Sequence, residues 1–195
     1  EVLGQSLDMT RGELTTQMRL PLGDQTADVR VLQFISRTCP VLSCQEVRLT
    51  APRAGELIVR TSIACGAETE MGIRVPPRND EVIDVMACCE APGRGSACGV
   101  AVKIDFPHAS AARGELAEGS REFTLNVENG REVVIRTIAA TLSSFYHPDT
   151  DLEACRLANW GAALGFDRLR EMNAGAWEEI WKSRVKVTGD DRAQW

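Results

Sequence analysis

Hydrophobic and polar residues alternate with a period of two over much of the first 145 residues. Successive side chains of a β-strand point to opposite faces, so each such run predicts a strand with one buried face. No helical pattern separates the runs, which favours an antiparallel β-sandwich, a mainly β fold. The runs cover residues 46–50, 57–63, 102–106, 123–127 and 133–139.

Residues typical of turns separate these runs. Pro52 to Gly55 lies between two of them, and Pro76 to Asp80 between two more. Asn129-Gly130 lies between two alternating strands, and both residues tolerate a positive φ. This dipeptide therefore predicts a β-hairpin.

The pattern changes to a helical one after His147-Pro148. Thr150 and Glu153 have the T-x-x-E spacing of a capping box, which predicts a helix start. A first helix is expected from there towards Gly165, and a second from about Phe166 to Lys182. The patterns divide the chain into a sandwich at 1–147, a two-helix segment at 148–183 and a final stretch at 184–195.

The composition is that of a soluble globular protein. Of 195 residues, 44% are hydrophobic and 26% are charged, and the net charge is −6. A nucleic-acid partner is not expected, because phosphate binding needs clustered Lys and Arg. No membrane partner is expected either, because no apolar run approaches the roughly 20 residues that cross a bilayer.

The seven cysteines form no C-x-x-C motif, and their odd number cannot pair fully within one chain. Only two histidines are present, far apart in the sequence. We therefore expect no metal site and free, mostly buried thiols in a reducing cytoplasm.

Two constellations could suggest chemistry in the strand region. The glycines from Gly93 to Gly99 miss the G-x-G-x-x-G spacing and precede a strand, so a hairpin loop is expected. Cys88 or Cys89 could act as a nucleophile with His108 as its base. Nothing in the sequence brings these residues together, so a core thiol and a loop histidine are expected instead.

The end of the strand region and the second helix hold two further candidates. Ser143, Ser144 and His147 lie close in sequence but lack a G-x-S-x-G elbow, which favours a polar link. Trp177 and Trp181 are spaced i and i+4, as in a packing face or a sugar-stacking platform. We favour packing, and the strand region up to about residue 145 contains no Trp or Tyr for a sugar platform.

Three segments together resemble glycoside hydrolase family 65. Residues 164–181, followed by 185–190, resemble the family's linker, where a histidine often stands in place of Asn173. Leu7 to Leu14 resembles a segment of the family's sandwich, and Gln33 to Arg37 resembles one of its strands. The family includes maltose, trehalose and kojibiose phosphorylases and related α-glucoside hydrolases.

The resemblance implies an N-terminal β-sandwich of the supersandwich kind, a two-helix linker, an (α/α)₆ catalytic barrel and a small C-terminal sheet. Residues 184–195 would then be the start of a missing barrel. The family's catalytic residues lie in that barrel, so the expected catalytic, cofactor-binding and metal-binding residues here are none. Trp160, Trp177 and Trp181 are expected to pack at the interdomain boundary.

The resemblance implies that this chain is a non-catalytic segment of an enzyme that hydrolyses or phosphorolyses α-glucosides, and the enzyme is expected in the cytoplasm. The choice between the two reactions stays open. Its expected partners are the missing barrel and a second copy in a homodimer. An α-linked glucosyl disaccharide would be bound only through the parent enzyme. The alternatives are a stand-alone carbohydrate-binding module and an independent enzyme that uses cysteine or metal chemistry.

Overall fold

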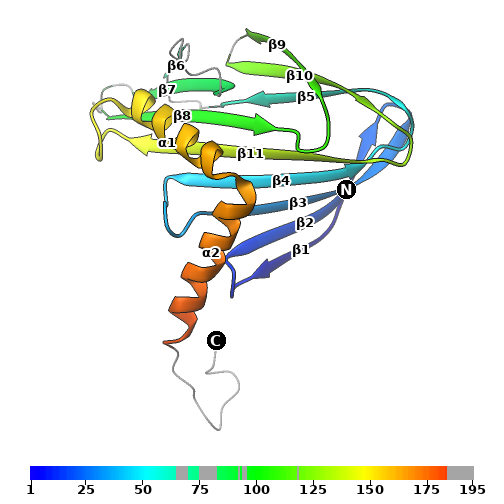
Figure 1. Cartoon of the computed structure of the whole chain (residues 1–195). Helices are drawn as coiled ribbons and strands as arrows, with labels where there is room; N and C mark the ends of the chain where they lie inside the picture. Colours follow the sequence, from blue (N-terminus) through cyan, green and yellow to red (C-terminus); the bar gives the residue numbers. More distant parts are fainter. Residues whose placement is uncertain (65–69, 75–82, 92, 94–95, 118, 184–195) are drawn as a thin grey trace.

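The computed structural model describes residues 1–64, 70–74, 83–91, 93, 96–117 and 119–183. In this part the chain forms two antiparallel sheets and then two helices (Figure 1), which confirms the predicted sandwich. In spatial order the larger sheet consists of β1 (Val2–Asp8), β2 (Glu13–Leu22), β3 (Gln25–Ile35), β4 (Leu42–Thr50), β11 (Glu132–Ser143), β8 (Ser96–Asp105), β7 (Val85–Ala91) and β6 (Glu70–Arg74). The smaller sheet consists of β5 (Gly55–Ser62), β10 (Ser120–Val127) and β9 (Ala111–Ala117).

The larger sheet is covered by different partners on its two faces. Strand β11 shows this best, because Val133 and Ile135 pack against the smaller sheet while Ile138 and Ala140 pack against the helices. The alternation follows from the period of two, and it explains why β11 is apolar along most of its length. The two larger hydrophobic clusters of the described residues therefore lie between the sheets and under the helices.

The Asn129-Gly130 turn does not join a hairpin, which corrects the prediction. Gly130 has a φ of 73°, as a turn requires, but β10 belongs to the smaller sheet and β11 to the larger one. The link from β4 to β5 also crosses between the sheets, and it contacts this turn. Ala51 N donates to Arg131 O at 3.0 Å, and Gly130 N donates to Ala51 O at 2.9 Å. The two crossings together form one corner of the sandwich.

A buried aspartate ties the two sheets together. Asp84 precedes β7 and accepts a hydrogen bond from Ile104 N of β8 at 2.7 Å. Arg113 of β9 forms an ion pair with the same carboxylate at 2.9 Å, and Arg121 of β10 donates to Asp84 O at 2.8 Å. A buried carboxylate needs such partners, so this cluster is part of the structure of the sandwich.

Helix α1 (Thr150–Leu164) lies across β8 and β11 and buries small residues, among them Ala154 and Ala158 (Figure 1). A Cβ on Gly99 of β8 would lie 2.2 Å from the backbone carbon of Thr150, so only glycine permits this close approach. The expected capping box is wrong. Thr150 is the first helical residue with its side chain buried, while the Glu153 side chain pairs with Arg156.

Helix α2 (Phe166–Trp181) follows after Gly165, so both helices are found where the periodicity predicts them. From α1 it runs past the ends of β4, β3, β2 and β1 (Figure 1). Neither of these helices is long and apolar enough to cross a membrane. The expected turn at Pro76 to Asp80 and the stretch 184–195 lie outside the described residues.

Candidate functional site

An ion pair whose carboxylate is buried anchors α2 to the larger sheet. Arg170 of α2 donates two hydrogen bonds, at 2.9 and 2.8 Å, to the carboxylate of Glu13 at the start of β2. Arg11 donates a third at 3.0 Å. Burial by itself raises the pKa of Glu13, but the hydrogen bonds from Arg170 and Arg11 outweigh it and hold the pKa below its ordinary value.

Asn173 holds α2 against two turns of the sheet. Its Oδ1 accepts a hydrogen bond from Arg37 N at 2.9 Å, and its Nδ2 donates to Arg11 O at 2.7 Å. The side chain is fully buried, so both of its polar ends need these partners. Neutral histidine also offers one donor and one acceptor, so the residue found here and the family's frequent histidine can make the same kind of bridge.

A second charged cluster anchors the first turn of α2. Arg136 of β11 donates to Glu46 of β4 at 2.8 Å and, through two hydrogen bonds of 3.0 and 2.9 Å, to Asp167. Its guanidinium also lies over the Phe166 ring, 4.9 Å from the ring centroid. Burial alone raises the pKa of Glu46, but hydrogen bonds from Arg48 and Arg136 lower it further than burial raises it.

Two of the predicted tryptophans lie together at the far end of α2. The Trp181 indole Nε1 donates to Met9 O at 2.7 Å. The Trp177 ring lies over Gly12, where a Cβ would be 2.1 Å from the indole nitrogen, and the φ of Gly12 is 62°. The β1–β2 turn and α2 therefore fit together only because residue 12 is glycine.

Trp177 and Trp181 form one wall of a groove of about 720 Å³. Its floor belongs to the face of the larger sheet on which the smaller sheet also packs. The floor lies beside the smaller sheet, at the ends of β3 and β4 that are next to α2. Strand register places Leu7, Leu14, Gln33, Gln45 and Thr137 in one row across the floor, on β1, β2, β3, β4 and β11. Ile35, Ser43 and Ala139 form the next row.

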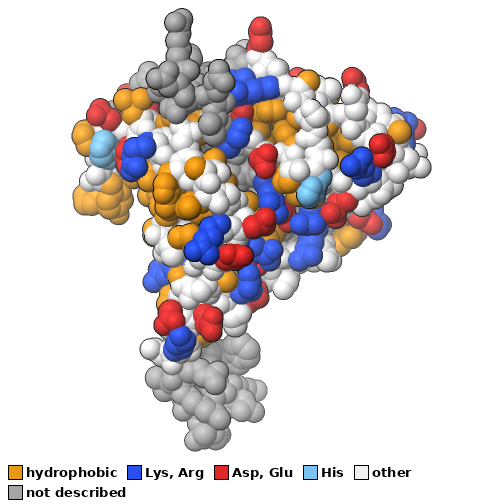
Figure 2. Space-filling model, in the orientation of Figure 1, with side chains coloured by type: hydrophobic (Ala, Val, Ile, Leu, Met, Phe, Trp, Pro, Cys, Tyr) orange, Lys and Arg blue, Asp and Glu red, His pale blue; other side chains and the backbone are white. Residues whose placement is uncertain are grey.

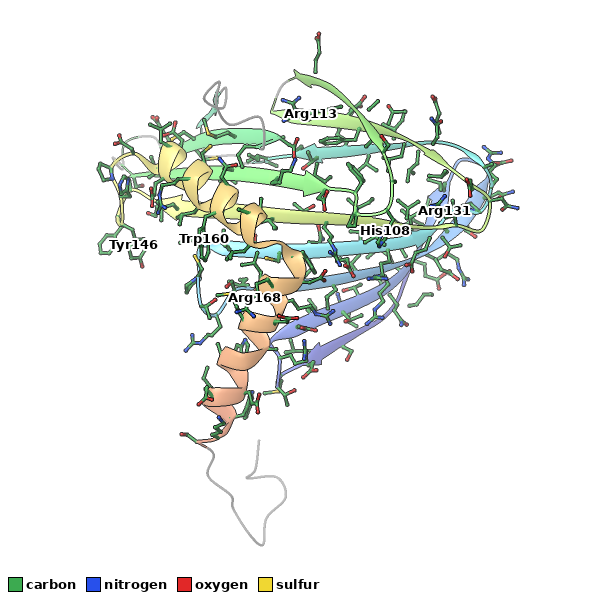
Figure 3. The ribbon with its side chains drawn as sticks, viewed as in Figure 1. His108, Arg113, Arg131, Tyr146, Trp160 and Arg168 are labelled. Carbon is green, nitrogen blue, oxygen red and sulfur yellow. The ribbon has the colours of Figure 1, made fainter. Side chains whose placement is uncertain are left out.

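The groove floor carries exposed apolar side chains. Leu7 is 62% exposed and Ile35 is 65% exposed. A further exposed apolar region is the link between β11 and α1, where Phe145 is 87% and Tyr146 77% exposed, with their rings 5.2 Å apart. Figure 2 shows exposed hydrophobic side chains at that end of the molecule, where Figure 3 labels Tyr146.

Trp160 lies apart from the other two predicted tryptophans. It is on α1, is 40% exposed and does not line the groove (Figure 3). Of the three tryptophans that the sequence pattern places on the two helices, the structure brings Trp177 and Trp181 together. The sequence pattern missed exposed Phe145, because this residue lies on the link between β11 and α1 and not in an element with a periodic pattern.

The serine and histidine candidates hold the link before α1. Ser144 Oγ accepts from Ala97 N at 3.0 Å, and Ser143 Oγ accepts from Phe145 N at 3.3 Å. His147 Nδ1 accepts from Asp149 N at 3.2 Å. Ser143 and His147 are used in local turns and Ser144 ties the link to β8, which agrees with the expected polar link.

The cysteines differ from the expectation at one position. Cys39, Cys44, Cys88, Cys98 and Cys155 are free, but Cys89 is disulfide-bonded, so the expected set of free thiols is wrong there. Burial raises the pKa of Cys44 to about 12, which makes it a poor nucleophile. Among the described residues, no group of three His, Cys, Asp or Glu side chains could hold a metal ion.

These features define an antiparallel β-sandwich domain with a firmly attached pair of helices. Among solved structures, a protein described as a kojibiose phosphorylase from the human microbiome shares this fold with a TM-score of 0.66. The match has 9% identity and covers 91% of this chain and 24% of that one. A heparinase III crystal structure matches with a TM-score of 0.42 and 10% identity over 73% of this chain and 21% of its own, too loosely to bear on the fold.

Residues 3–180 match the family described as glycosyl hydrolase family 65, N-terminal domain. The chain therefore belongs to this family, and it corresponds to the N-terminal domain of the family's enzymes. No curated protein matches the sequence. The chain spans about a quarter of the length of the solved phosphorylase that it matches.

Proposed function

We propose that this chain is a non-catalytic domain of an enzyme that hydrolyses or phosphorolyses α-glucosides, and that it supports the catalytic barrel. The observation that carries the proposal is the rigid attachment of α2. Glu13 of the sheet and Asn173 of α2 each take part in a buried contact between the sheet and the helix, and Arg136 of the sheet pairs with Asp167 in the first turn of α2. A helix held in this way gives a following domain a fixed starting direction.

The exposed apolar side chains support the same proposal. Phe145, Tyr146 and Trp160 lie on or next to α1, and large aromatic side chains gain most from burial at an interface. They are the surface that we expect a barrel domain to cover. Hydrolysis and phosphorolysis stay open, because the residues that would distinguish them belong to the barrel.

A homodimer and a cytoplasmic location are further parts of this proposal. Exposed Val2, Leu3 and Leu7 on β1 favour association of the chain with a second copy. Sedimentation as a monomer at high protein concentration would contradict the dimer. Five free thiols favour a reducing compartment, and the disulfide of Cys89 is the observation against it.

The coding sequence on both sides of this segment tests the supporting role first. A reading frame that continues past Trp195 into helical repeats with an acidic residue supports the proposal. A stop codon directly after Trp195 overturns the supporting role, because no barrel would then follow in the same chain.

An activity assay tests the non-catalytic role. The chain is incubated with maltose, trehalose and kojibiose, each with and without inorganic phosphate. The expected result is no release of glucose or glucose 1-phosphate above the blank. Turnover that copurifies with the chain, and that is lost when the chain is depleted with an antibody, contradicts the proposal.

A further inference from the structure

The floor of the groove between α2 and the larger sheet carries uncharged hydrogen-bonding side chains. Gln33, Gln45 and Thr137 are direct neighbours on β3, β4 and β11. Neighbouring side chains in such a row stand about 5 Å apart. Ser43 adds a hydroxyl in the next row. Four polar side chains thus converge on one small area of an otherwise apolar groove.

The two glutamine amides have no hydrogen-bond partner within the part of the chain that the structure describes. Each amide offers two donors and an acceptor with two lone pairs. Gln33 is exposed and Gln45 is half-buried. A protein surface of apolar side chains over the groove would bury these groups unpaired, which is costly. An occupant that brings its own donors and acceptors avoids that cost.

The walls of the groove are apolar and partly aromatic. Trp177 and Trp181 stand on one side, Leu7 and Leu14 continue the floor, and Ile35 lies beside them. No side chain among the described residues that line the groove is charged. The volume of about 720 Å³ lies within the range of small-molecule sites. The occupant that fits is therefore neutral, with one apolar side and one side rich in hydroxyl groups.

We propose that this groove binds a neutral oligosaccharide of about two or three pyranose rings. The C–H faces of the sugar rings pack against Trp177, Trp181 and Ile35. The ring hydroxyls donate to and accept from Gln33 and Gln45, with Thr137 and Ser43 at the margin. The sandwich region has no Trp of its own, so α2 completes the site by supplying its aromatic wall.

A titration of the 195-residue chain tests the proposal. Maltotriose, maltose and kojibiose are the first probes, a choice that rests on the proposed function, and cellotriose is included because the groove chemistry does not depend on the linkage. Binding is followed by isothermal titration calorimetry and by tryptophan fluorescence. We expect saturable binding with a Kd of about 1 mM or lower for at least one trisaccharide. A trisaccharide that carries a uronate should bind more weakly, because the groove has no cation to pair with it.

Two variants and a matched control locate the binding. Gln45→Ala and Gln33→Ala should each weaken binding about fivefold, since each removes one or more hydrogen bonds. Gln17→Ala is the control, because Gln17 is an exposed glutamine of the same sheet on the opposite face. Circular dichroism shows that each variant is folded. Gln33 and Gln17 are exposed and Gln45 is half-buried, and neither glutamine of the groove has a hydrogen-bond partner among the described residues, so folding should be unchanged.

Three results would overturn the proposal. One is the lack of saturable binding of any neutral trisaccharide up to about 20 mM. Another is equal affinity in Gln45→Ala, Gln33→Ala and the unsubstituted chain, and the third is an equal loss in Gln17→Ala. In the first case, the groove is a protein interface instead. None of these results affects the coding-sequence test, so failure of this inference is distinct from failure of the proposed function.

Discussion

Replacement of Asn173 by leucine tests how α2 is attached to the sandwich. Leucine has the same number of side-chain heavy atoms and the same branching as asparagine, so the change removes hydrogen bonds without leaving a cavity. Arg37 N and Arg11 O each lose the partner that Asn173 gives them, at 2.9 and 2.7 Å. The rest of the α2 seam, including the ion pair of Arg170 with Glu13, is left in place.

The expected loss in the free energy of unfolding is about 2–3 kcal/mol. A buried polar group without a partner costs about 1–3 kcal/mol, and two such groups are created. We take the lower end of the total for two groups, about 2–3 kcal/mol, because Arg37 and Arg11 lie near the surface and leucine regains some apolar burial. In a domain of this size each kcal/mol shifts the Tm by about 2–4 °C. The Tm should therefore fall by roughly 4–12 °C.

Urea unfolding, followed by far-ultraviolet circular dichroism and by tryptophan fluorescence, measures the effect. Asn126→Leu is the control, since Asn126 is an exposed residue of β10, and it should stay within about 0.5 kcal/mol of the unsubstituted chain. Asn173→His should lose less than Asn173→Leu, because histidine keeps a donor and an acceptor. An Asn173→Leu chain as stable as the control refutes the role given to this residue.

Two more predictions concern the cores of the domain. Gly99→Ala should lower the free energy of unfolding by about 3 kcal/mol in a urea titration, because its Cβ meets the Thr150 backbone at 2.2 Å. Gly175→Ala, whose Cβ has nothing within 4 Å, should instead stabilise α2 by about 0.5–1 kcal/mol, and a loss there equal to that of Gly99→Ala refutes the reasoning. The lowered pKa values of Glu13 and Glu46 give stability that is present above the ordinary glutamate pKa and is lost as pH falls through the lower native values. The urea concentration at the midpoint of unfolding should thus decrease as the pH falls below about 4.3. The decrease should be less steep in the Glu13→Gln, Glu46→Gln double variant. Parallel curves for the two proteins would contradict this reasoning.

The periodicity of the sequence predicted both helices and the strands β4, β5, β8, β10 and β11. The helices start and end close to the expected residues. This follows because alternation and helical spacing are local properties, and each element here buries a face with that spacing. The sandwich class also follows, because runs of strands without helices between them have few ways to bury their apolar faces.

The pairing of the strands could not be predicted in the same way. Asn129-Gly130 has the composition of a hairpin turn, yet β10 and β11 enter different sheets. The turn residues fix only the local reversal of the chain, while the neighbours of a strand depend on the whole sandwich. The capping box failed for a similar reason. The Thr150 side chain is buried between α1 and the sheet, so it does not cap the helix.

The groove shows why sequence reasoning favoured packing for Trp177 and Trp181. The i, i+4 spacing says only that the two rings share one face of a helix. The role of that face depends on the residues opposite it, and there Gln33, Gln45 and Thr137 come from three different strands. Only the register between the strands places these three side chains in one row. The lack of Trp and Tyr in the strand region is thus no argument against a sugar site, because the helix brings its tryptophans to the sheet.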